Sequence, residues 1–448
     1  MKSNLDDKRL LTHAPIGRLF LTYAIPSVIT MVFYGFQSLV DGVIVSNHLG
    51  AEAVGGVSII MPFYSAIMVI SLIVGVGTQA LIGNLLGKKN NEEAQNVMTT
   101  GFWALLVIGI LVTVCSYLFA EDFTRLLGAD EVLLPYALGY MKGLLPFVVP
   151  ITLAFYCDAM LKATGHPKVS SLIMSSAVVL NLLLSLFFIV VLEWGITGAS
   201  VATGLAFTIA LLVSATITFR SKSSMSMLKG TFQFSMLRQA FYNGSSEGVS
   251  ELASAMTILI MNLAIMDMVG AAGVAALSAI NYVNFTGVLL FLGISDGLIP
   301  VLSYNYGAKQ FKRVRRLYRF ALTVNIVVGL VVFTFLQFFG DLAVGIFFDS
   351  SNSEVFDIAL QGLSIYSFVF LMNGFNILTT SFFTALGQAK SSIIIAGLRG
   401  LVFVVGGVAL LPSFFGMDGI WATIPVAEFL TLFVAVFLVV GANRKILY

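Results

Sequence analysis

The sequence predicts an all-α membrane protein of about 12 transmembrane helices, which we expect to form two six-helix lobes. Three observations predict this fold class: a strongly apolar composition, a series of long uncharged segments, and an internal repeat. Of the 448 residues, 58% are hydrophobic and only 10% are charged, whereas about 25% of the residues in a typical soluble domain are charged. A water-soluble chain of this length could not cover so much apolar surface.

Several uncharged segments exceed the roughly 20 residues that a helix needs to cross the hydrocarbon core of a bilayer. Among them are residues 53–83, 95–120, 194–219, 268–295 and 358–389. A membrane β-barrel is excluded, because its strands would be about ten residues long and would alternate apolar with polar side chains. With charged runs and Pro or Gly turns as boundaries, the expected helices are 17–46, 53–83, 95–120, 132–159, 169–192, 195–219, 243–267, 273–300, 318–341, 356–383, 391–411 and 418–441.

The connecting segments alternate between basic and acidic composition. The basic set holds Lys88, Lys89, Lys162, Lys168, Arg220, Lys222, Lys229, Arg238, Lys309, Lys312, Arg313, Arg315, Arg316, Arg319 and Lys390, and the termini add Lys2, Lys8, Arg9, Arg444 and Lys445. The acidic set holds Glu121, Asp122, Asp130, Glu131, Glu193, Asp267, Asp341, Asp349, Glu354, Asp357 and Asp418, with Arg125 as its clear basic member. By the positive-inside rule, we expect a multi-pass protein of the cytoplasmic (inner) membrane with both termini cytoplasmic. No cleavage pattern follows the basic N-terminal stretch, so we expect no removable signal peptide.

The chain also repeats itself. A constant offset of 220 residues aligns Gly50 with Gly270, Ala51 with Ala271, Val54 with Val274, Ser58 with Ser278 and Gly87 with Gly307. Because six is an even number of spans, a second copy of a six-helix unit enters the membrane in the same orientation as the first. This predicts two lobes related by a pseudo-two-fold axis along the membrane normal. The expected division is an N-terminal lobe at 1–219, a cytoplasmic linker at 220–240 and a C-terminal lobe at 241–448.

The first expected helix carries a polar stripe. Its members lie at i, i+3, i+4 and i+7, a spacing that places them on one helical face, and they are Tyr34, Gln37, Ser38 and Asp41. The stripe fits the wall of a cavity, so we predict that the three neutral residues contact substrate. A carboxylate inside a spanning helix is costly, and Asp41 is therefore predicted either to bind a cation or to exchange a proton. A structural hydrogen-bonding role is the alternative.

Polar residues on the fifth expected helix extend this hypothesis. Asn181 and Ser185 are one turn apart and could supply neutral oxygen ligands facing Asp41. Asn181 is the candidate for ion coupling and Ser185 for substrate contact, although Asn in a spanning helix also serves as an interhelical hydrogen-bonding residue. Pro26 lacks a backbone donor and predicts a kink in the first helix.

The second half offers its own acids. Glu247 and Glu251 lie at i and i+4, where like charges repel and favour a proton on one of them. Glu251 is deeper in its helix and is the candidate for ion coupling, whereas Glu247 is a candidate for substrate binding or a solvated acid near the helix end. Further candidates for substrate binding, each with packing as the alternative, are Asn281, Asn373 and Asn376.

Three more charged residues fall within or near expected helices. Arg399 lies deep in the eleventh helix and needs an acidic or carbonyl partner, with Glu251 and Glu428 as the alternatives. Asp158 and Asp296 fall near helix ends, where a local cap or a loop anchor is expected.

Soluble enzyme chemistry has little support. The sequence has no G-x-x-x-x-G-K-[ST] phosphate loop and no H-E-x-x-H metal motif, and it contains only 3 His and 2 Cys. Cys115 and Cys157 lie in apolar runs, so neither a disulfide framework nor a Cys-based metal site is expected. We therefore expect no enzyme, no cofactor and no nucleic-acid partner, and an ion gradient or the substrate's own gradient as the energy source.

Several segments resemble the multidrug and toxic compound extrusion (MATE) family, over nearly the whole chain. In the first half these are residues 39–42 (LVDG) with 49–50 (LG) and 53–54 (AV), and 83–88 (GNLLGK) with 93–94 (EA). In the second half they are Pro300 and residues 303–308 (SYNYGA). The resemblance implies a V-shaped, two-lobe exporter that exchanges Na+ or H+ for amphipathic, often cationic compounds.

The resemblance also implies roles for particular residues. Asp41 and Asn181 match the positions that such families use for ion coupling, and they would be metal ligands only if the ion is Na+. Ser185 stands where many relatives have Asp, and the tenth helix lacks the acid of some sodium-driven members. These departures leave the choice between H+ and Na+ open.

The function expected is that of a secondary active multidrug or metabolite exporter, acting in the bilayer as a monomer on small amphipathic, cationic substrates by alternating access. A flippase for a lipid-linked precursor is the first rival, and a membrane scaffold or receptor is the second. A flippase that holds pyrophosphate should have a basic cavity, yet the basic residues deep in expected helices are Lys142 and Arg399. Two lobes with Asp41 and Glu251 inside the bilayer argue against a scaffold.

Overall fold

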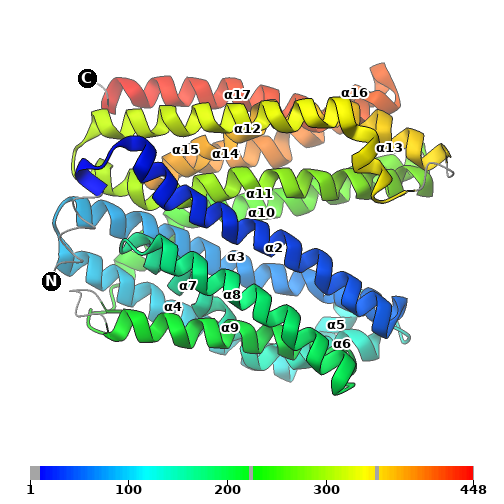
Figure 1. Ribbon diagram of the computed structural model, residues 1–448, viewed down its shortest axis with the longest axis horizontal. Coiled ribbons are helices and arrows are strands. Elements are labelled where there is room, and N and C mark those ends of the chain that lie inside the picture. The colour runs from blue at the N-terminus through cyan, green and yellow to red at the C-terminus, as the bar shows by residue number, and fades with distance from the viewer. Residues whose placement is uncertain (1–10, 221–225, 349–352, 447–448) are drawn as a thin grey trace.

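The computed structural model describes residues 11–220, 226–348 and 353–446 (Figure 1). Its first half holds α2 (Ile16–Leu49), α3 (Ala51–Gly87), α4 (Asn91–Leu118), α5 (Ala120–Leu126), α6 (Leu134–Leu144), η1 (Leu145–Phe147), α7 (Val148–Ala163), α8 (Pro167–Leu186), η2 (Phe187–Val191) and α9 (Gly195–Arg220). Its second half holds α10 (Phe234–Met268), α11 (Ala271–Gly307), α12 (Phe311–Gly345), α13 (Ser353–Tyr366), η3 (Ser367–Val369), α14 (Phe370–Ala385), α15 (Ala389–Gly397), η4 (Leu398–Val402), α16 (Phe403–Phe415) and α17 (Met417–Ile446).

These elements make up 12 helices that are long and apolar enough to cross a membrane, counted over the described residues. The α6–η1–α7 segment forms one such span, and the α13–η3–α14 segment forms another. The predicted fold class is confirmed. Of the charges used for the topology, Lys2, Lys8, Arg9, Lys222 and Asp349 lie outside the described residues.

The backbone repeats the pattern of the sequence. Four pairs of residues with a positive φ occupy matching places in the two halves: Gly50 and Gly270, Lys89 and Lys309, Gly165 and Gly387, and Gly195 and Gly416. The left-handed region is costly for most residues, so its recurrence marks the same turns in both copies. The 3-10 turns η1 and η3 also interrupt equivalent spans. The two halves are therefore copies of one six-helix unit.

Several helices extend beyond the expected segments, and α10 and α12 do so by the most at their starts. Helix α10 begins at Phe234 rather than at residue 243, and α12 begins at Phe311 rather than at residue 318. On α12, Val314, Leu317 and Tyr318 are buried, so an amphipathic turn continues past the uncharged run. The basic residues from 312 to 319, expected in a loop, lie on this turn.

The expected linker at 220–240 therefore includes the first turns of α10. The segment before that helix is held along the start of α4, where Thr99 accepts from the backbone N–H of Gly230 at 3.0 Å and Thr100 from that of Gln233 at 3.0 Å. The domain limits 1–219, 220–240 and 241–448 stay a prediction.

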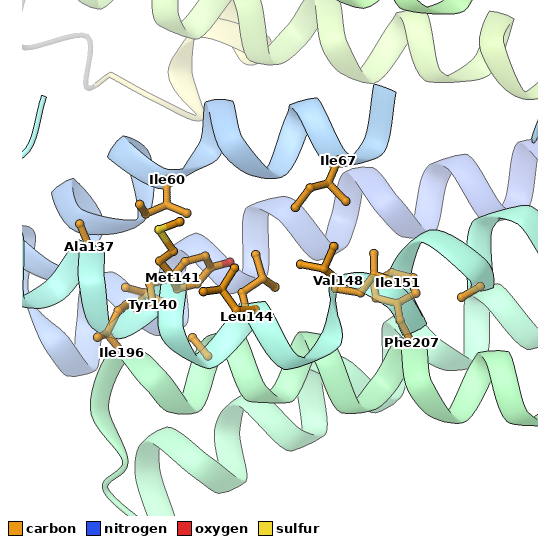
Figure 2. Close-up of a cluster of buried hydrophobic side chains, with 14 of the residues drawn as sticks. Ile60, Ile67, Ala137, Tyr140, Met141, Leu144, Val148, Ile151, Ile196 and Phe207 are labelled. Atoms are coloured by element: carbon orange, nitrogen blue, oxygen red, sulfur yellow. The ribbon is translucent and has the colours of Figure 1, made fainter. Parts of the chain in front are cut away.

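Each half has its own apolar core. In the first half, the α6–η1–α7 span packs between α3 and α9, and Met141, Leu144 and Val148 are almost completely buried (Figure 2). Ile60 and Ile67 of α3 close one side of this cluster. The corresponding core of the second half is formed around Trp421, which is fully buried. Each lobe is thus packed independently.

The two lobes meet through glycine-rich helix crossings. A Cβ atom on Gly77 of α3 would lie 1.9 Å from the Ala240 oxygen, and one on Gly244 of α10 would lie 1.9 Å from the Ile73 oxygen. On the other side of the axis, Gly293 and Gly297 of α11 make similarly close contacts with α2. Figure 1 shows α2 crossing obliquely at the boundary between the two groups of helices. The pairs α3–α10 and α11–α2 are related by the repeat.

The lobes separate toward one end of the bundle. Along α3, the face that contacts α10 at Val69 and Ile73 continues through Ala66 and Pro62 to Ser58, and these three residues are exposed. Along α11, the face that contacts α2 at Gly293 likewise continues to exposed residues, which are Thr286, Tyr282 and Ser278. One apolar cluster joins both lobes, and it lies at the opposite end, where Tyr23 and Val76 meet Leu298. These faces of the two lobes are thus uncovered toward one end and packed together at the other, and the uncovered faces of α3 and α11 are called the cleft below.

The two ends of the bundle differ in charge. The closed end, here the basic end, carries the turns around residues 88–90, 164–166, 308–310 and 386–388, whereas the open end is the acidic end. Arg125 of α5, at the acidic end, pairs with Glu131 at 2.8 Å and with Glu121 at 3.1 Å. Hydrogen bonds to these carboxylates raise the pKa of Arg125 above its usual value. Arg125, the basic exception in the acidic set, is therefore neutralised by two neighbouring carboxylates.

Candidate functional site

A polar cluster in the first lobe contains Asp41. Helix α2 brings this partly buried carboxylate against α8, where the Ser185 hydroxyl donates to Asp41 Oδ1 at 3.5 Å. Asn181, fully buried one turn earlier on α8, lies beside the same carboxylate. The predicted stripe of α2 and the predicted pair of α8 thus face each other.

The Asn181 amide can be oriented from its surroundings, because a carboxylate accepts and does not donate. With its NH2 group toward Asp41, it donates to Oδ2 at 3.1 Å and to Oδ1 at 3.3 Å, and its oxygen accepts from the Thr203 hydroxyl at 3.0 Å. The Nε2 atom of Gln37 lies 2.8 Å from the Asn181 amide atom that faces Asp41. Thr203, on α9, completes the cluster and was not among the predicted site residues.

The remaining residues of the predicted stripe differ in exposure. Tyr34 packs against Phe155 with ring centroids 5.8 Å apart, and among the described residues its buried hydroxyl has no hydrogen-bond partner. Ser38 is exposed. In residues 11–220, 226–348 and 353–446, no ion pair involves Asp41. The charge of Asp41 is therefore surrounded by neutral groups.

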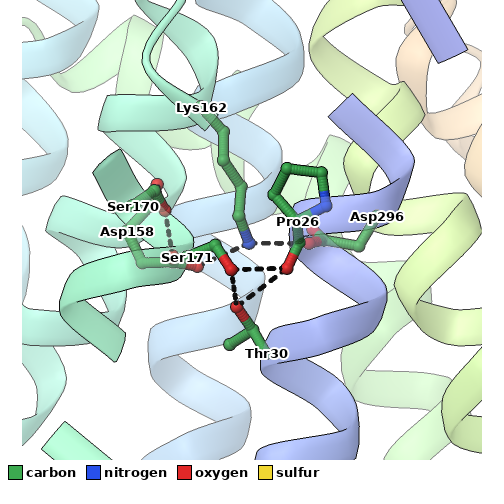
Figure 3. Close-up of polar contacts among 7 residues, drawn as sticks. All are labelled: Pro26, Thr30, Asp158, Lys162, Ser170, Ser171 and Asp296. Carbon is green, nitrogen blue, oxygen red and sulfur yellow. Dashed lines mark hydrogen bonds and ion pairs between the residues drawn. The ribbon is translucent and has the colours of Figure 1, made fainter. Parts of the chain in front are cut away.

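Pro26 lies inside α2, nearer its N-terminal end than Asp41, and Figure 3 shows its polar contacts. The Pro26 carbonyl accepts from the Ser171 hydroxyl at 2.6 Å and from the Thr30 hydroxyl at 3.1 Å. These bonds give the Pro26 carbonyl two side-chain donors, in a helix where the proline itself has no backbone N–H to donate. They also tie α2 to α8, the helix that carries Asn181.

In the second lobe, Arg399 forms an ion pair with a buried acid. The Nε atom of Arg399 lies 3.3 Å from Oε1 of Glu428 on α17, and Asn376 donates to Glu428 Oε2 at 2.6 Å and to its backbone oxygen at 2.9 Å. Glu428 is only 3% exposed. Of the two partners considered for Arg399, the structure selects Glu428 rather than Glu251. Asn376, predicted to contact substrate, is engaged in this buried group.

The acids of α10 face the cleft. Gly244 and Gly248 contact α3, and Glu247 and Glu251 lie on the same face at a spacing of three residues from each. Glu247 is partly exposed and Glu251 is exposed. Asn281 is partly exposed on α11, whereas Asn373 is buried on α14. Among these predicted residues, Glu247, Glu251 and Asn281 are the accessible ones.

A buried ion cluster joins the lobes at the basic end (Figure 3). Lys162, at the end of α7 and 3% exposed, contacts Asp158 Oδ2 at 2.6 Å and Asp296 Oδ2 of α11 at 2.7 Å. Ser170 also donates to Asp158. Lys162 was expected in a loop, and the two acids were expected as local caps or loop anchors, so this cluster was missed. The spacing of Asp158 and Lys162, one helical turn apart, was the signal for its first half.

Known proteins of similar sequence match this chain over most of the length of both chains. The multidrug export protein MepA of Staphylococcus saprophyticus is 24% identical over 423 residues, covering 92% of this chain and 91% of the relative. MepA of Staphylococcus haemolyticus is 24% identical over 442 residues, covering 96% and 95%.

Solved structures share the fold. A crystal structure of MATE in complex with MaL6 superposes with a TM-score of 0.92 at 22% identity, covering 98% of each chain. An outward-facing conformation of a multidrug resistance MATE family transporter gives 0.91 at 22% identity, again over 98% of each chain. A transporter of the MOP superfamily from Pyrococcus furiosus gives the same three values. The two-lobe, all-α architecture is thus that of these transporters.

The sequence model of the MatE family matches this chain twice, at residues 26–187 and again at residues 248–408. The two matches correspond to the two copies of the internal repeat and together cover most of the chain. Membership of a transporter family agrees with the prediction that the protein is not an enzyme. The chain belongs to the MatE family of multi-pass membrane transporters.

Proposed function

We propose that this protein is a secondary active exporter that exchanges H+ for small amphipathic cations by alternating access. The relatives named as multidrug export proteins support the substrate class. The positive-inside rule supports a cytoplasmic basic end in the inner membrane, with both termini cytoplasmic. The cleft then faces outward in this conformation. One chain contains both lobes, so a monomer suffices.

The observation that carries this proposal is the neutral surrounding of Asp41. A lone carboxylate in a spanning helix is costly, and it must be neutralised by a bound cation or by a proton. The Ser185 hydroxyl donates to it, and the Asn181 amide donates to it in the orientation assigned above from its surroundings. They serve a carboxylate that gains and loses a proton. Sodium would need oxygen ligands, and hence a reversed Asn181 amide.

The charge of the cleft favours cationic cargo. Glu247 and Glu251 are accessible, and among the described residues neither forms an ion pair. Arg399 is paired with Glu428 and offers no free positive charge. We propose Tyr34, Ser38 and Asn281 as neutral contacts for the substrate. The flippase alternative, which requires a basic cavity, receives no support from the comparisons or from these charges.

Closure at the basic end is assigned to the buried ion cluster. Lys162 and Asp158 belong to the first lobe and Asp296 to the second, so the Lys162–Asp296 contact must break when that end opens. Buried charges separated from their partners are costly. The contact therefore stabilises the conformation in which the basic end is closed and the cleft is open at the acidic end. Binding of the substrate and the ion to the other conformation offsets this stabilisation.

The test is efflux of tetraphenylphosphonium from proteoliposomes under an imposed proton or sodium gradient. We expect a proton gradient to drive efflux by the intact protein, and Asp41→Asn to lose at least about 90% of that rate. Ser46→Ala, exposed on the same helix and outside the predicted polar stripe, is the matched control and should retain most of it. Efflux driven equally in Asp41→Asn, or driven by sodium alone, would overturn the proposed coupling.

A further inference from the structure

A groove on the second lobe lies away from the cleft. It runs between α12 and α17 with α14 as its floor, at the basic end of all three helices, and its volume is about 200 Å³. In Figure 1, α12 and α17 run alongside each other on the outer side of this lobe. The walls are largely apolar, and the residues that matter below are Arg315, Arg319, Phe375, Phe382 and Val439.

Two arginines form the polar part of the groove. Arg315 and Arg319 lie one turn apart on α12, a spacing at which like charges repel. Within residues 11–220, 226–348 and 353–446, neither forms an ion pair. The Nε atom of Arg315 is buried and has no hydrogen-bond partner in the same ranges. Burying such a donor without a partner is unfavourable, so the site lacks an acceptor, and an anion would supply it.

The neighbouring basic residues do not share this environment. Arg313 donates to the Ala14 oxygen at 2.6 Å and to the Leu11 oxygen at 3.1 Å. Lys312 and Arg316 are exposed and do not line the groove. The two groove arginines are therefore distinct from a general basic surface, although all five residues lie on the first turns of α12.

The apolar walls indicate what carries the anion. Val436 and Val440 of α17 are 43% and 52% exposed at the groove, so it opens sideways into the space that surrounds a spanning bundle. The hydroxyl of Tyr318, on α12, forms a hydrogen bond of 2.8 Å with the Thr379 hydroxyl, and the ring of Tyr318 lines the groove. A soluble anion would gain nothing from these walls, whereas an acyl chain would bury apolar surface against them.

We propose that this groove binds an anionic phospholipid of the leaflet at the basic end. Its phosphate is held between Arg315 and Arg319, and an acyl chain lies along Phe375, Phe382 and Val439. Basic pockets between spanning helices bind anionic headgroups through the same combination of charge and apolar contact. The proposal depends only on insertion in a membrane and is independent of the exporter and of Asp41.

The experiment is native mass spectrometry of the full-length protein titrated with palmitoyl-oleoyl phosphatidylglycerol or with the corresponding phosphatidylcholine. We expect one phosphatidylglycerol to bind at least about tenfold more tightly than phosphatidylcholine. Arg315→Gln/Arg319→Gln should remove this preference. The control Lys312→Gln/Arg316→Gln, with the same change of charge on the same turns, should keep it.

A second pair of variants tests the acyl contact without changing charge. Val439→Trp fills the groove and should weaken phosphatidylglycerol binding, whereas Phe437→Trp, on the exposed face of α17, should not. Equal loss in both charge variants, or no preference in the intact protein, would overturn the site. Displacement of the lipid by 10-fold excess inorganic phosphate would show a free-phosphate site and overturn the lipid assignment.

Discussion

At the scale of single residues, the buried carboxylates fall into two kinds. Glu428 is paired with Arg399, and Asp158 and Asp296 share Lys162. Asp41 contacts only neutral groups. The first kind links helices through ion pairs, and the second kind is the one for which we propose a change of charge state. This difference, rather than burial alone, separates a structural acid from a candidate coupling acid.

The distinction predicts different effects on stability. Glu428→Gln leaves the largely buried Arg399 side chain, 18% exposed, without its counter-charge, and we expect it to lower the free energy of unfolding by about 3 kcal/mol. Glu251→Gln, on the exposed face of the same lobe, should change it by less than about 1 kcal/mol. Thermal unfolding of both variants in one detergent measures the difference. Similar melting temperatures would contradict the structural role of Glu428.

The sequence predicted part of the first-lobe cluster. The spacing of Gln37 and Asp41 placed them on one face, and Asn181 and Ser185 were expected opposite that face, as the structure has them. Thr203 could not be found, because its contact depends on how α9 packs on α8. The Lys162 cluster was missed for the same reason, since its partner Asp296 comes from the other lobe.

At the scale of helices, the spans were predictable from composition, but their ends were not. Charge was taken as the boundary of each helix, whereas α12 continues through its basic residues because Val314 and Leu317 on the opposite face are buried. The same reasoning applies to α10, which begins at Phe234. Amphipathic turns at a membrane surface keep apolar contacts on one face and charge on the other.

The helix crossings predict a strong dependence on glycine. Gly244→Val would place a Cβ atom 1.9 Å from the Ile73 oxygen, so α3 and α10 must move apart. We expect a loss of about 1–3 kcal/mol in stability from this overpacking. Gly406→Ala on α16, where a Cβ atom meets no atom within 4 Å, is the control and should be neutral. Thermal unfolding that ranks the two variants equally would contradict the close crossing.

At the scale of the whole molecule, the repeat explains both the symmetry and the cleft. Two copies of one unit meet through equivalent helix pairs, α3 with α10 and α11 with α2, and the alternating access proposed above would rotate the lobes about these crossings. The offset of the repeat was visible in the sequence. The conformation was not, because both states of such a molecule share the same spans and the same internal cores.

The open end can be tested by thiol labelling in a Cys115→Ala background. Ser58→Cys and Ser278→Cys occupy equivalent exposed positions in the two lobes, and we expect both to react with a membrane-impermeant methanethiosulfonate added from the acidic side. Ser303→Cys, fully buried at the basic end, should not react. Labelling at residue 303 by the same reagent added from the basic side, with protection of 58 and 278 from the acidic side, would indicate that the protein rests in the opposite state.

In the proposed exchange, a substrate cation and a proton on Asp41 exclude each other. Linkage then requires that binding of one releases the other. Proton release can be measured with a pH indicator in weakly buffered detergent solution as tetraphenylphosphonium is added. We expect about one proton to be released for each cation bound by the intact protein, and none by Asp41→Asn. Cation binding without proton release, or equal release from Asp41→Asn, would contradict it.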